Sequence, residues 1–302
     1  MIEQSRRRFL HKSLAVILDE IDADVMKAAL IAKAAGLEAV ELRMAFGQNI
    51  VTLHDSQLLE IKRHLQSLGL QVCALATPLF KCFIPGEEGK GQIGDQFGFE
   101  VLDYFAHKNL IDRIIEISEF FDVTKIRCFS FWATSCLSED KLEQIAELLS
   151  PAVEAVSKAK KILILENENN CYIKTAQDAD RLLRLLDNPS VRLLWDPGNG
   201  RLAGENEEQA VICGQKWVEH VHIKDFLFSK GKVTFVSPGK GIIHYATILL
   251  SLQKAGYRGC FSFEPCLGKL DKKTFIRMVQ DFLRKTCNPP EVEHDSSCIA
   301  KS

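Results

Sequence analysis

Short apolar runs alternate with helix-like segments along most of this chain, and this alternation limits the folds it can adopt. The first run, SLAVILDE, is followed by ADVMKAALIAKAAG, which has helical spacing and ends at Gly36, a typical C-terminal cap. The same order recurs through seven further runs, which are LEAVELR, LQVCALAT, KIRCFSFW, KILILEN, VRLLWD, VEHVHIKD and CFSFE. Eight strands that alternate with eight helices predict a parallel sheet covered by helices.

Eight such units fit an α/β fold, the (β/α)8 TIM barrel, which forms a single domain at a length near 302 residues. An open doubly wound sheet is the alternative, but it normally carries a glycine-rich phosphate-binding turn after its first strand, and this chain has none there. We therefore expect a TIM barrel domain over residues 1–287 and a loosely ordered C-terminal tail over 288–302. The polar, glycine-rich stretch from Lys81 to about Gln96 predicts a long loop over one end of the barrel, a candidate lid.

Charge and apolar run length bear on the partners of the protein. A net charge of −2 and a pI near 6.5 give no electrostatic basis for binding nucleic acid or an anionic membrane. No segment approaches the roughly 20 apolar residues of a membrane span. We therefore expect neither nucleic acid nor membrane as a partner. The oligomeric state stays open, and a homo-oligomer is one option.

The N-terminus and the cysteines bear on location. Residues 5–10, SRRRFL, resemble a twin-arginine export signal, but Asp19 and Glu20 close the following apolar run early, so we interpret LAVIL as the first strand. The ten cysteines form no CxxC pair, and several lie inside apolar runs, where cysteine acts as a small core residue. We expect reduced thiols in a cytoplasmic protein.

Four acidic or imidazole residues stand at the ends of four apolar runs: Glu166, Asp196, His222 and Glu264. The carboxyl ends of barrel strands meet at one rim, where active sites lie. The set could be solvated loop residues, but its recurrence at four strand ends favours a metal site. Three carboxylates and one imidazole suit Mn²⁺ or Mg²⁺, with Co²⁺ or Zn²⁺ as further options.

Strand alternation places other polar residues inside the barrel, where they must be paired or functional because burying them alone is costly. Glu41 shares a strand face with Arg43, and we expect it to contact either substrate or the barrel structure. His220 and Lys224 share a face with the strand-end histidine. We expect His220 to pack inside the barrel or to support the metal ligands, and Lys224 either to contact a substrate oxygen or phosphate or to pair with Asp225 or another acid. Arg127 is expected to anchor an interior ion pair.

The chain resembles the xylose-isomerase-like TIM barrel superfamily, in its sugar phosphate isomerase/epimerase branch. The matching stretches lie between Ser13 and about Thr286 and are GLEAVELR, KIRCFSFW, ILILEN, LLWDPGN, HVHIKD and the run from GKG to GYRGCFSFEP. The resemblance implies that one divalent metal ion is bound by four residues: Glu166, Asp196, His222 and Glu264. It also implies that Glu166 and Glu264 are catalytic, one removing a proton next to a carbonyl and the other returning it from the opposite side. A metal ion that polarises the carbonyl and stabilises the enediolate lowers the barrier to this step.

The chain departs from the family pattern at two positions that usually touch substrate. Many epimerases have a histidine three residues after the metal-binding aspartate, where this chain has Asn199, and another two residues after the first glutamate, where it has Glu168. Together with Glu41 and Lys224, these residues form the predicted substrate-binding set. The resemblance implies a small-molecule carbohydrate as substrate, either a sugar, a sugar phosphate or a polyol, and the two departures leave its identity open.

Three other functions remain alternatives to an isomerase or epimerase. A dehydratase or lyase acting on a cyclic polyol begins with the same proton abstraction. DNA repair, as in endonuclease IV, would need a three-metal site with extra histidines, and the third and fourth strands here end without histidine. A barrel that binds a ligand without catalysis is opposed by the complete ligand set.

Overall fold

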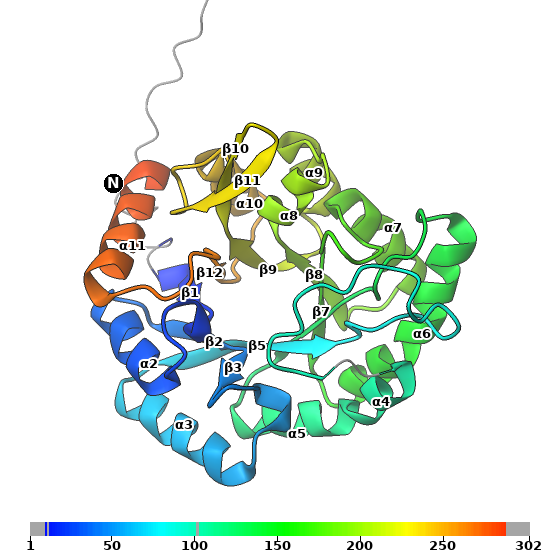
Figure 1. The fold of residues 1–302 in the computed structure, drawn as a ribbon, viewed down its shortest axis with the longest axis horizontal. Coiled ribbons are helices and arrows are strands. Elements are labelled where there is room, and N and C mark those ends of the chain that lie inside the picture. The colour runs from blue at the N-terminus through cyan, green and yellow to red at the C-terminus, as the bar shows by residue number, and fades with distance from the viewer. Residues whose placement is uncertain (1–9, 11, 101–102, 288–302) are drawn as a thin grey trace, which may run out of the picture.

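The computed structural model describes residues 10, 12–100 and 103–287, which form a ring of parallel strands enclosed by helices (Figure 1). The sheet has eight strands in the order β1-β12-β9-β8-β7-β6-β5-β2. A parallel bridge between Ile17 and Glu41 joins the first and last strands of this order and closes the ring. The predicted (β/α)8 TIM barrel is therefore confirmed. The export-like segment 5–10, apart from Leu10, and the tail 288–302 lie outside the described residues.

The barrel strands fall within the eight predicted apolar runs, except that the third extends two residues beyond its run. They are β1 (Leu14–Val16), β2 (Ala39–Leu42), β5 (Gln71–Leu79), β6 (Lys125–Cys128), β7 (Ile162–Glu166), β8 (Val191–Trp195), β9 (Val218–Ile223) and β12 (Phe261–Phe263). Their apolar side chains are almost entirely buried and form the main hydrophobic core with the inner faces of the helices. Both faces of the sheet are shielded from solvent, the inner face by the barrel interior and the outer face by the helices. The strand sequences are therefore almost continuously apolar.

Helices cover the outside of the barrel. They are α2 (Val25–Ala34), α3 (Asp55–Ser67), α4 (Tyr104–Asn109), α5 (Ile111–Phe120), α6 (Glu139–Lys158), α7 (Ala176–Leu186), α8 (Pro197–Leu202), α9 (Glu207–Gly214), α10 (Tyr245–Lys254) and α11 (Lys272–Cys287). Polar side chains cap the N-termini of several of these helices. The Asp24 side chain accepts hydrogen bonds from backbone N–H groups in the first turn of α2, and Thr175 forms a capping box with Asp178 at α7. Gly36 adopts a φ of 86° just after α2, as its predicted capping role requires.

Several elements differ from the sequence prediction. The fourth strand stops at Cys128, because the chain turns at Phe131, which has a φ of 65°. The segment before the fourth strand forms two helices, α4 and α5, which are divided at Leu110. Beyond Ile17 the first run forms a short 3-10 helix, η1 (Leu18–Glu20), and a second one, η2 (Ile50–Thr52), precedes α3. Two hairpins were not predicted: β3 (Met44–Ala45) with β4 (Gln48–Asn49), and β10 (Asp225–Ser229) with β11 (Lys232–Val236).

The long loop predicted between the third strand and the next helix is confirmed. No helix or strand forms over residues 81–100, and this cyan segment crosses the same end of the ring as the carboxyl ends of the strands (Figure 1). Glu87 in the loop accepts hydrogen bonds of 2.7 Å from both the Thr134 and the Tyr172 hydroxyls. Asn49 donates a hydrogen bond of 3.2 Å to the Phe97 carbonyl at the other end of the loop. The loop is therefore tied down on two sides of the barrel mouth.

Two further features concern the whole described chain. Within the described ranges, no helix combines the length and the apolar composition needed to cross a membrane. No disulfide joins the cysteines in those ranges. Cys128 is buried, whereas Cys73, Cys213 and Cys260 are only half-buried.

Candidate metal centre

The four predicted strand-end residues meet at the carboxyl rim of the barrel. Glu166 ends β7, Asp196 directly follows β8, His222 lies in β9 and Glu264 directly follows β12. One potential ligand atom from each of them lies within 4.8 Å of the others, and all four residues are buried. Nδ1 of His222 is 3.3 Å from Oε1 of Glu166 and 3.4 Å from Oε2 of Glu264. The structure therefore brings together the complete predicted ligand set.

Three buried cations surround these carboxylates. Arg127 donates a hydrogen bond of 3.1 Å to Oε2 of Glu166, so the interior ion pair expected for it is confirmed. Arg43 donates a hydrogen bond of 2.7 Å to Oε1 of Glu264. Nζ of Lys224 lies 2.9 Å from Oδ2 of Asp196 and 2.9 Å from Oε2 of Glu264. Each glutamate thus gives one oxygen to an arginine and turns the other toward His222.

Burial and charge pull the pKa values of the three acids in different directions. Burial raises the pKa of Asp196 to about 6; Lys224 opposes this shift, and the neighbouring glutamates add to it. Burial also raises the pKa of Glu166 and of Glu264, but the nearby cations outweigh it, and both pKa values lie below the usual range. Both glutamates are therefore ionised at neutral pH.

His222 responds to the same surroundings with the opposite sign. Burial lowers its pKa, but the carboxylates of Glu41, Glu166 and Glu264 more than offset this, and the pKa lies well above 6.5. A cation between these acids is strongly favoured, and without a metal ion a proton on the imidazole supplies it.

The donor set fits a divalent metal ion. Oδ2 of Asp196 and Oε2 of Glu264 are buried and accept no hydrogen bond of good geometry, although Lys224 lies close to both. Metal–ligand bonds of about 2.1 Å place adjacent ligand atoms about 3.0–3.4 Å apart. The separations of 3.3 and 3.4 Å around Nδ1 of His222 match this spacing. The four residues therefore present donor atoms of the kind and spacing that one divalent ion binds.

Local structure fixes the position of Asp196. Its Oδ1 accepts the backbone N–H of Asn199 at 2.9 Å and caps α8, which leaves Oδ2 to face the site. The Asn167 side chain accepts from the Asp196 N–H at 2.7 Å and donates to its carbonyl at 2.9 Å, so the ends of β7 and β8 are joined. A Cβ at Gly198 would lie 2.4 Å from Cγ of Lys224, so only glycine lets the lysine approach Asp196 this closely.

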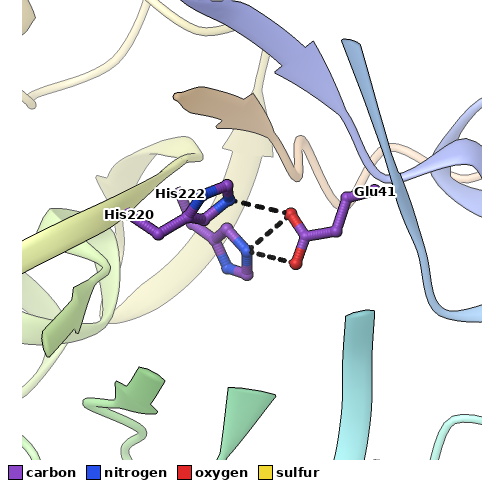
Figure 2. A group of neighbouring side chains, drawn as sticks. All are labelled: Glu41, His220 and His222. Carbon is purple, nitrogen blue, oxygen red and sulfur yellow. Dashed lines mark hydrogen bonds and ion pairs between the residues drawn. The ribbon is translucent and has the colours of Figure 1, made fainter. Parts of the chain in front are cut away.

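The predicted substrate-binding residues lie at different depths. Lys224 pairs with Asp196 and Glu264, and Oδ1 of Asn199 is 3.3 Å from its Nζ, so both residues border the metal centre. Glu168 lies at the rim, half-buried, with an oxygen 3.8 Å from Nζ of Lys81. Glu41 lies inside the barrel and is fully buried, hydrogen-bonded to His220 and His222 (Figure 2). Substrate contact by these four residues stays a prediction.

Asp225, the acid next to Lys224 in the sequence, has a different task. Its carboxylate accepts backbone N–H groups from Gly239, Gly241 and Ile243 at 2.8–3.2 Å. It therefore anchors the segment after the β10–β11 hairpin, and Lys224 is left to pair with the acids of the centre.

The loop over the barrel mouth adds residues that sequence reasoning missed. The Phe97 ring centroid lies 4.0 Å from Nζ of Lys81, 4.5 Å from Cζ of Arg43 and 5.0 Å from Cζ of Arg127. Lys81 is buried, and Phe129 also contacts its ammonium group, at 4.5 Å. Phe97 thus covers the arginines that hold the two glutamates. In the sequence, the one sign of this role is an aromatic residue inside a polar loop. That sign does not indicate which cations the ring contacts.

The fold and the site define a class, a parallel β/α barrel with a buried carboxylate and histidine cluster at its carboxyl rim. The family model described as xylose isomerase-like TIM barrel matches residues 29–286. The chain belongs to this family, and the resemblance predicted from the sequence is confirmed.

Individual relatives and solved structures of the same fold are similar to this chain at identities of 17–25%. An inosose dehydratase from Lacticaseibacillus casei is 25% identical over 171 residues, which are 51% of this chain and 57% of that protein. The chain spans about half the length of the curated relatives it matches. The crystal structure of the IOLI protein with a bound zinc atom aligns with a TM-score of 0.70 at 17% identity and covers 91% of this chain and 98% of that one. The apo structure of 3-keto-D-glucoside 4-epimerase from E. coli aligns with a TM-score of 0.65 at 17% identity and covers 91% and 100%.

Proposed function

We propose that this protein is a divalent-metal-dependent isomerase or epimerase of a small carbohydrate that acts by moving a proton next to a carbonyl. The observation that carries the proposal is the convergence of Glu166, Asp196, His222 and Glu264, with two buried acceptor atoms that accept no hydrogen bond. When bound, the ion would polarise the substrate carbonyl and stabilise the enediolate.

Two glutamates are suited to the proton transfers. Glu166 and Glu264 come from β7 and β12, which are separated in the ring by β8 and β9, so they face the site from different sides. Both are ionised at neutral pH because the cations around them lower their pKa values. Arg127 and Arg43 each hold one oxygen of the respective carboxylate and so fix its orientation. One carboxylate can remove a proton and the other can return it on the opposite face.

The chemistry of the ligands favours particular ions. Three carboxylates and one imidazole suit Mn²⁺ or Mg²⁺ best, and Co²⁺ or Zn²⁺ also accept such a set. The crystal structure of the IOLI protein contains a bound zinc atom, which supports the presence of a metal ion in a protein of this fold.

A dehydratase acting on a cyclic polyol is the second candidate, favoured by the inosose dehydratases among the relatives. It would begin with the same proton removal and continue with loss of a hydroxyl group. The two activities are separable with ketoses, phosphorylated sugars and inososes in deuterated water. An epimerase exchanges a carbon-bound hydrogen and keeps the hydroxyl count, whereas a dehydratase forms a product lighter by one water.

The experiment that tests the proposal is solvent exchange in glutamate variants. Glu166→Gln and Glu264→Gln should each abolish deuterium incorporation into a substrate that the wild-type protein exchanges, because glutamine cannot accept the proton and because each glutamate is also a proposed ligand of the metal ion. Glu219→Gln is the matched control, since Glu219 lies near the start of β9, at the opposite end of the barrel, and pairs with Lys125 at 3.3 Å. Retained exchange in either of the first two variants would refute the proton-transfer role.

A further inference from the structure

Glu41 faces two histidines of β9, His220 and His222, of which His222 also belongs to the candidate metal centre (Figure 2). Its Oε2 is 3.1 Å from Nε2 of His220, and its Oε1 and Oε2 are 3.3 and 3.2 Å from Nε2 of His222. All three side chains are fully buried. Figure 2 shows the carboxylate of Glu41 pointing toward both rings.

The backbone shows that this arrangement is built into the barrel. The pairing of β2 with β5 shifts register between Val40 and Glu41. The pairing of β8 with β9 shifts between Leu193 and Leu194, so that Leu194 lies opposite His220. Register shifts of this kind re-aim side chains and are common beside active sites. Both strands that supply the cluster therefore pair irregularly at the cluster itself.

The chemistry of a carboxylate decides which ring nitrogens carry protons. An ionised carboxylate only accepts hydrogen bonds, so the Nε2 atoms of His220 and His222 must both be donors. A neutral imidazole that is protonated on Nε2 has its lone pair on Nδ1. For His222, Nδ1 is the atom that faces Glu166 and Glu264 at 3.3 and 3.4 Å.

We propose that Glu41 is a positioning residue that fixes the tautomer and the ring orientation of His222. By accepting the Nε2–H, it presents Nδ1 as a lone-pair donor to a metal ion. A metal-bound histidine commonly donates its other N–H to a carboxylate in this way, and the loss of such a partner weakens metal binding. The inference rests on the proposed metal site, and it gives Glu41 a role other than the substrate contact predicted from the sequence.

A second metal ion between Glu41, His220 and His222 is the competing arrangement, because their ligand atoms also lie within 4.8 Å of one another. It would require His222 to bind ions through both ring nitrogens. It would also bury a dication beside a single carboxylate, which leaves its charge poorly balanced. Hydrogen bonds of 3.1–3.3 Å satisfy the same atoms without this cost. We therefore expect one ion per chain.

The variant that tests the role is Glu41→Gln. Its amide keeps one acceptor oxygen where the carboxylate has two, so in either orientation an NH₂ donor replaces one of the two oxygens that contact Nε2 of His222, and the negative charge is lost. His222 can accept from the amide only by moving its proton to Nδ1, which removes the lone pair that faces the metal. We expect Mn²⁺ and Zn²⁺ affinity, measured by competition with a chelator, to fall by about 10–100-fold.

His220→Gln is the matched control. It changes the other donor to Glu41, on the same strand, and leaves the contact between Glu41 and His222 in place. We expect its metal affinity to stay within about threefold of wild type, which is smaller than the effect of losing an orienting partner. An equal loss in both variants would show that Glu41 acts only through general packing, and it would overturn the proposal.

A measurement on the wild-type protein keeps the test independent of variant folding. Nitrogen NMR of the zinc-loaded, ¹⁵N-histidine-labelled protein should show His222 protonated on Nε2 and metal-bound through Nδ1. The reverse assignment, or two ions per chain, would overturn the inference. Failure of the wild type to bind Mn²⁺ or Zn²⁺ would refute the proposed function itself. Normal wild-type binding with unchanged affinity in Glu41→Gln would refute only the positioning role.

Discussion

Charged side chains are buried in this barrel because each is balanced by an opposite charge at close range. Arg43, which directly follows β2, contacts Asp19, Glu20 and Glu264 at 2.6–2.7 Å. It therefore joins η1 to the carboxyl end of β12. The guanidinium of Arg127 donates hydrogen bonds to Glu166 and to the backbone carbonyls of two residues of β5. These pairs hold the two proposed proton-transfer groups ionised and in fixed orientations. A single residue removed from such a set leaves an uncompensated charge.

Arg127→Met tests this balance. The change keeps the length of the side chain but leaves Glu166 without its cation and the carbonyls of Ala76 and Thr77 without donors. Removing one partner of a buried pair costs about 3–5 kcal/mol, so we expect a loss of this size in urea denaturation. The control is Arg284→Met, which breaks the exposed pair with Asp281 and should change stability by less than about 1 kcal/mol. Equal effects of the two variants would contradict the account.

Metal binding should depend on pH because protons compete for the ligands. The pKa of Asp196 is raised to about 6 and that of His222 lies above its usual value, so in the metal-free protein both hold protons to higher pH than usual. Metal affinity should therefore strengthen as pH rises through 6, and binding should release protons. Calorimetry in buffers of different ionisation enthalpy measures this release. Affinity that is constant or that weakens between pH 5.5 and about 8 would contradict the assignment.

At the scale of elements, the loop over residues 81–100 contacts the buried cations of the site through one aromatic ring. Phe97 stacks on Lys81, Arg43 and Arg127, and the last two hold the proposed catalytic glutamates. Cation–π contacts of this type contribute about 0.5–2 kcal/mol each. Through Phe97, the loop thus contacts the two arginines that fix the orientation of the proposed catalytic glutamates.

Phe97→Ala should weaken substrate binding and leave the metal centre intact. The loss of about 1–2 kcal/mol of loop contacts predicts a KM raised roughly tenfold, with metal affinity unchanged because no metal ligand lies on the loop. The control is Phe105→Ala, since Phe105 is 62% exposed on α4. Unaltered KM and kcat in Phe97→Ala would show that the loop does not act as a lid.

Local pattern was enough to predict some elements and not others. The eight apolar runs, their helices and the strand-end acids follow rules that operate within a few residues, and the structure confirms them. Helix α8 was missed because its sequence, PGNGRL, is typical of a turn, and it forms because Asp196 caps it. The register shifts beside Glu41 and His220 depend on neighbouring strands, so no local pattern indicates them.

At the scale of the whole molecule, the site depends on contacts between distant parts of the chain. The hydrogen bond between Arg43 and Glu264 spans 221 positions, and that between His222 and Glu41 spans 181. Closure of the barrel creates both, which is why a single sequence indicated that these residues were polar and inward-facing but not which of them would pair. The same closure assembles four ligands from four strands at one rim.

Metal content tests the central claim most directly. Purified wild-type protein, stripped with a chelator and incubated with excess Mn²⁺ or Zn²⁺, should retain one ion per chain by elemental analysis after dialysis. The double variant Asp196→Asn, Glu264→Gln should retain none, because it removes two of the four anionic or imidazole ligands. A wild-type protein that stays metal-free, or a double variant that binds the ion as tightly as wild type, would contradict the metal centre and the proton chemistry built on it.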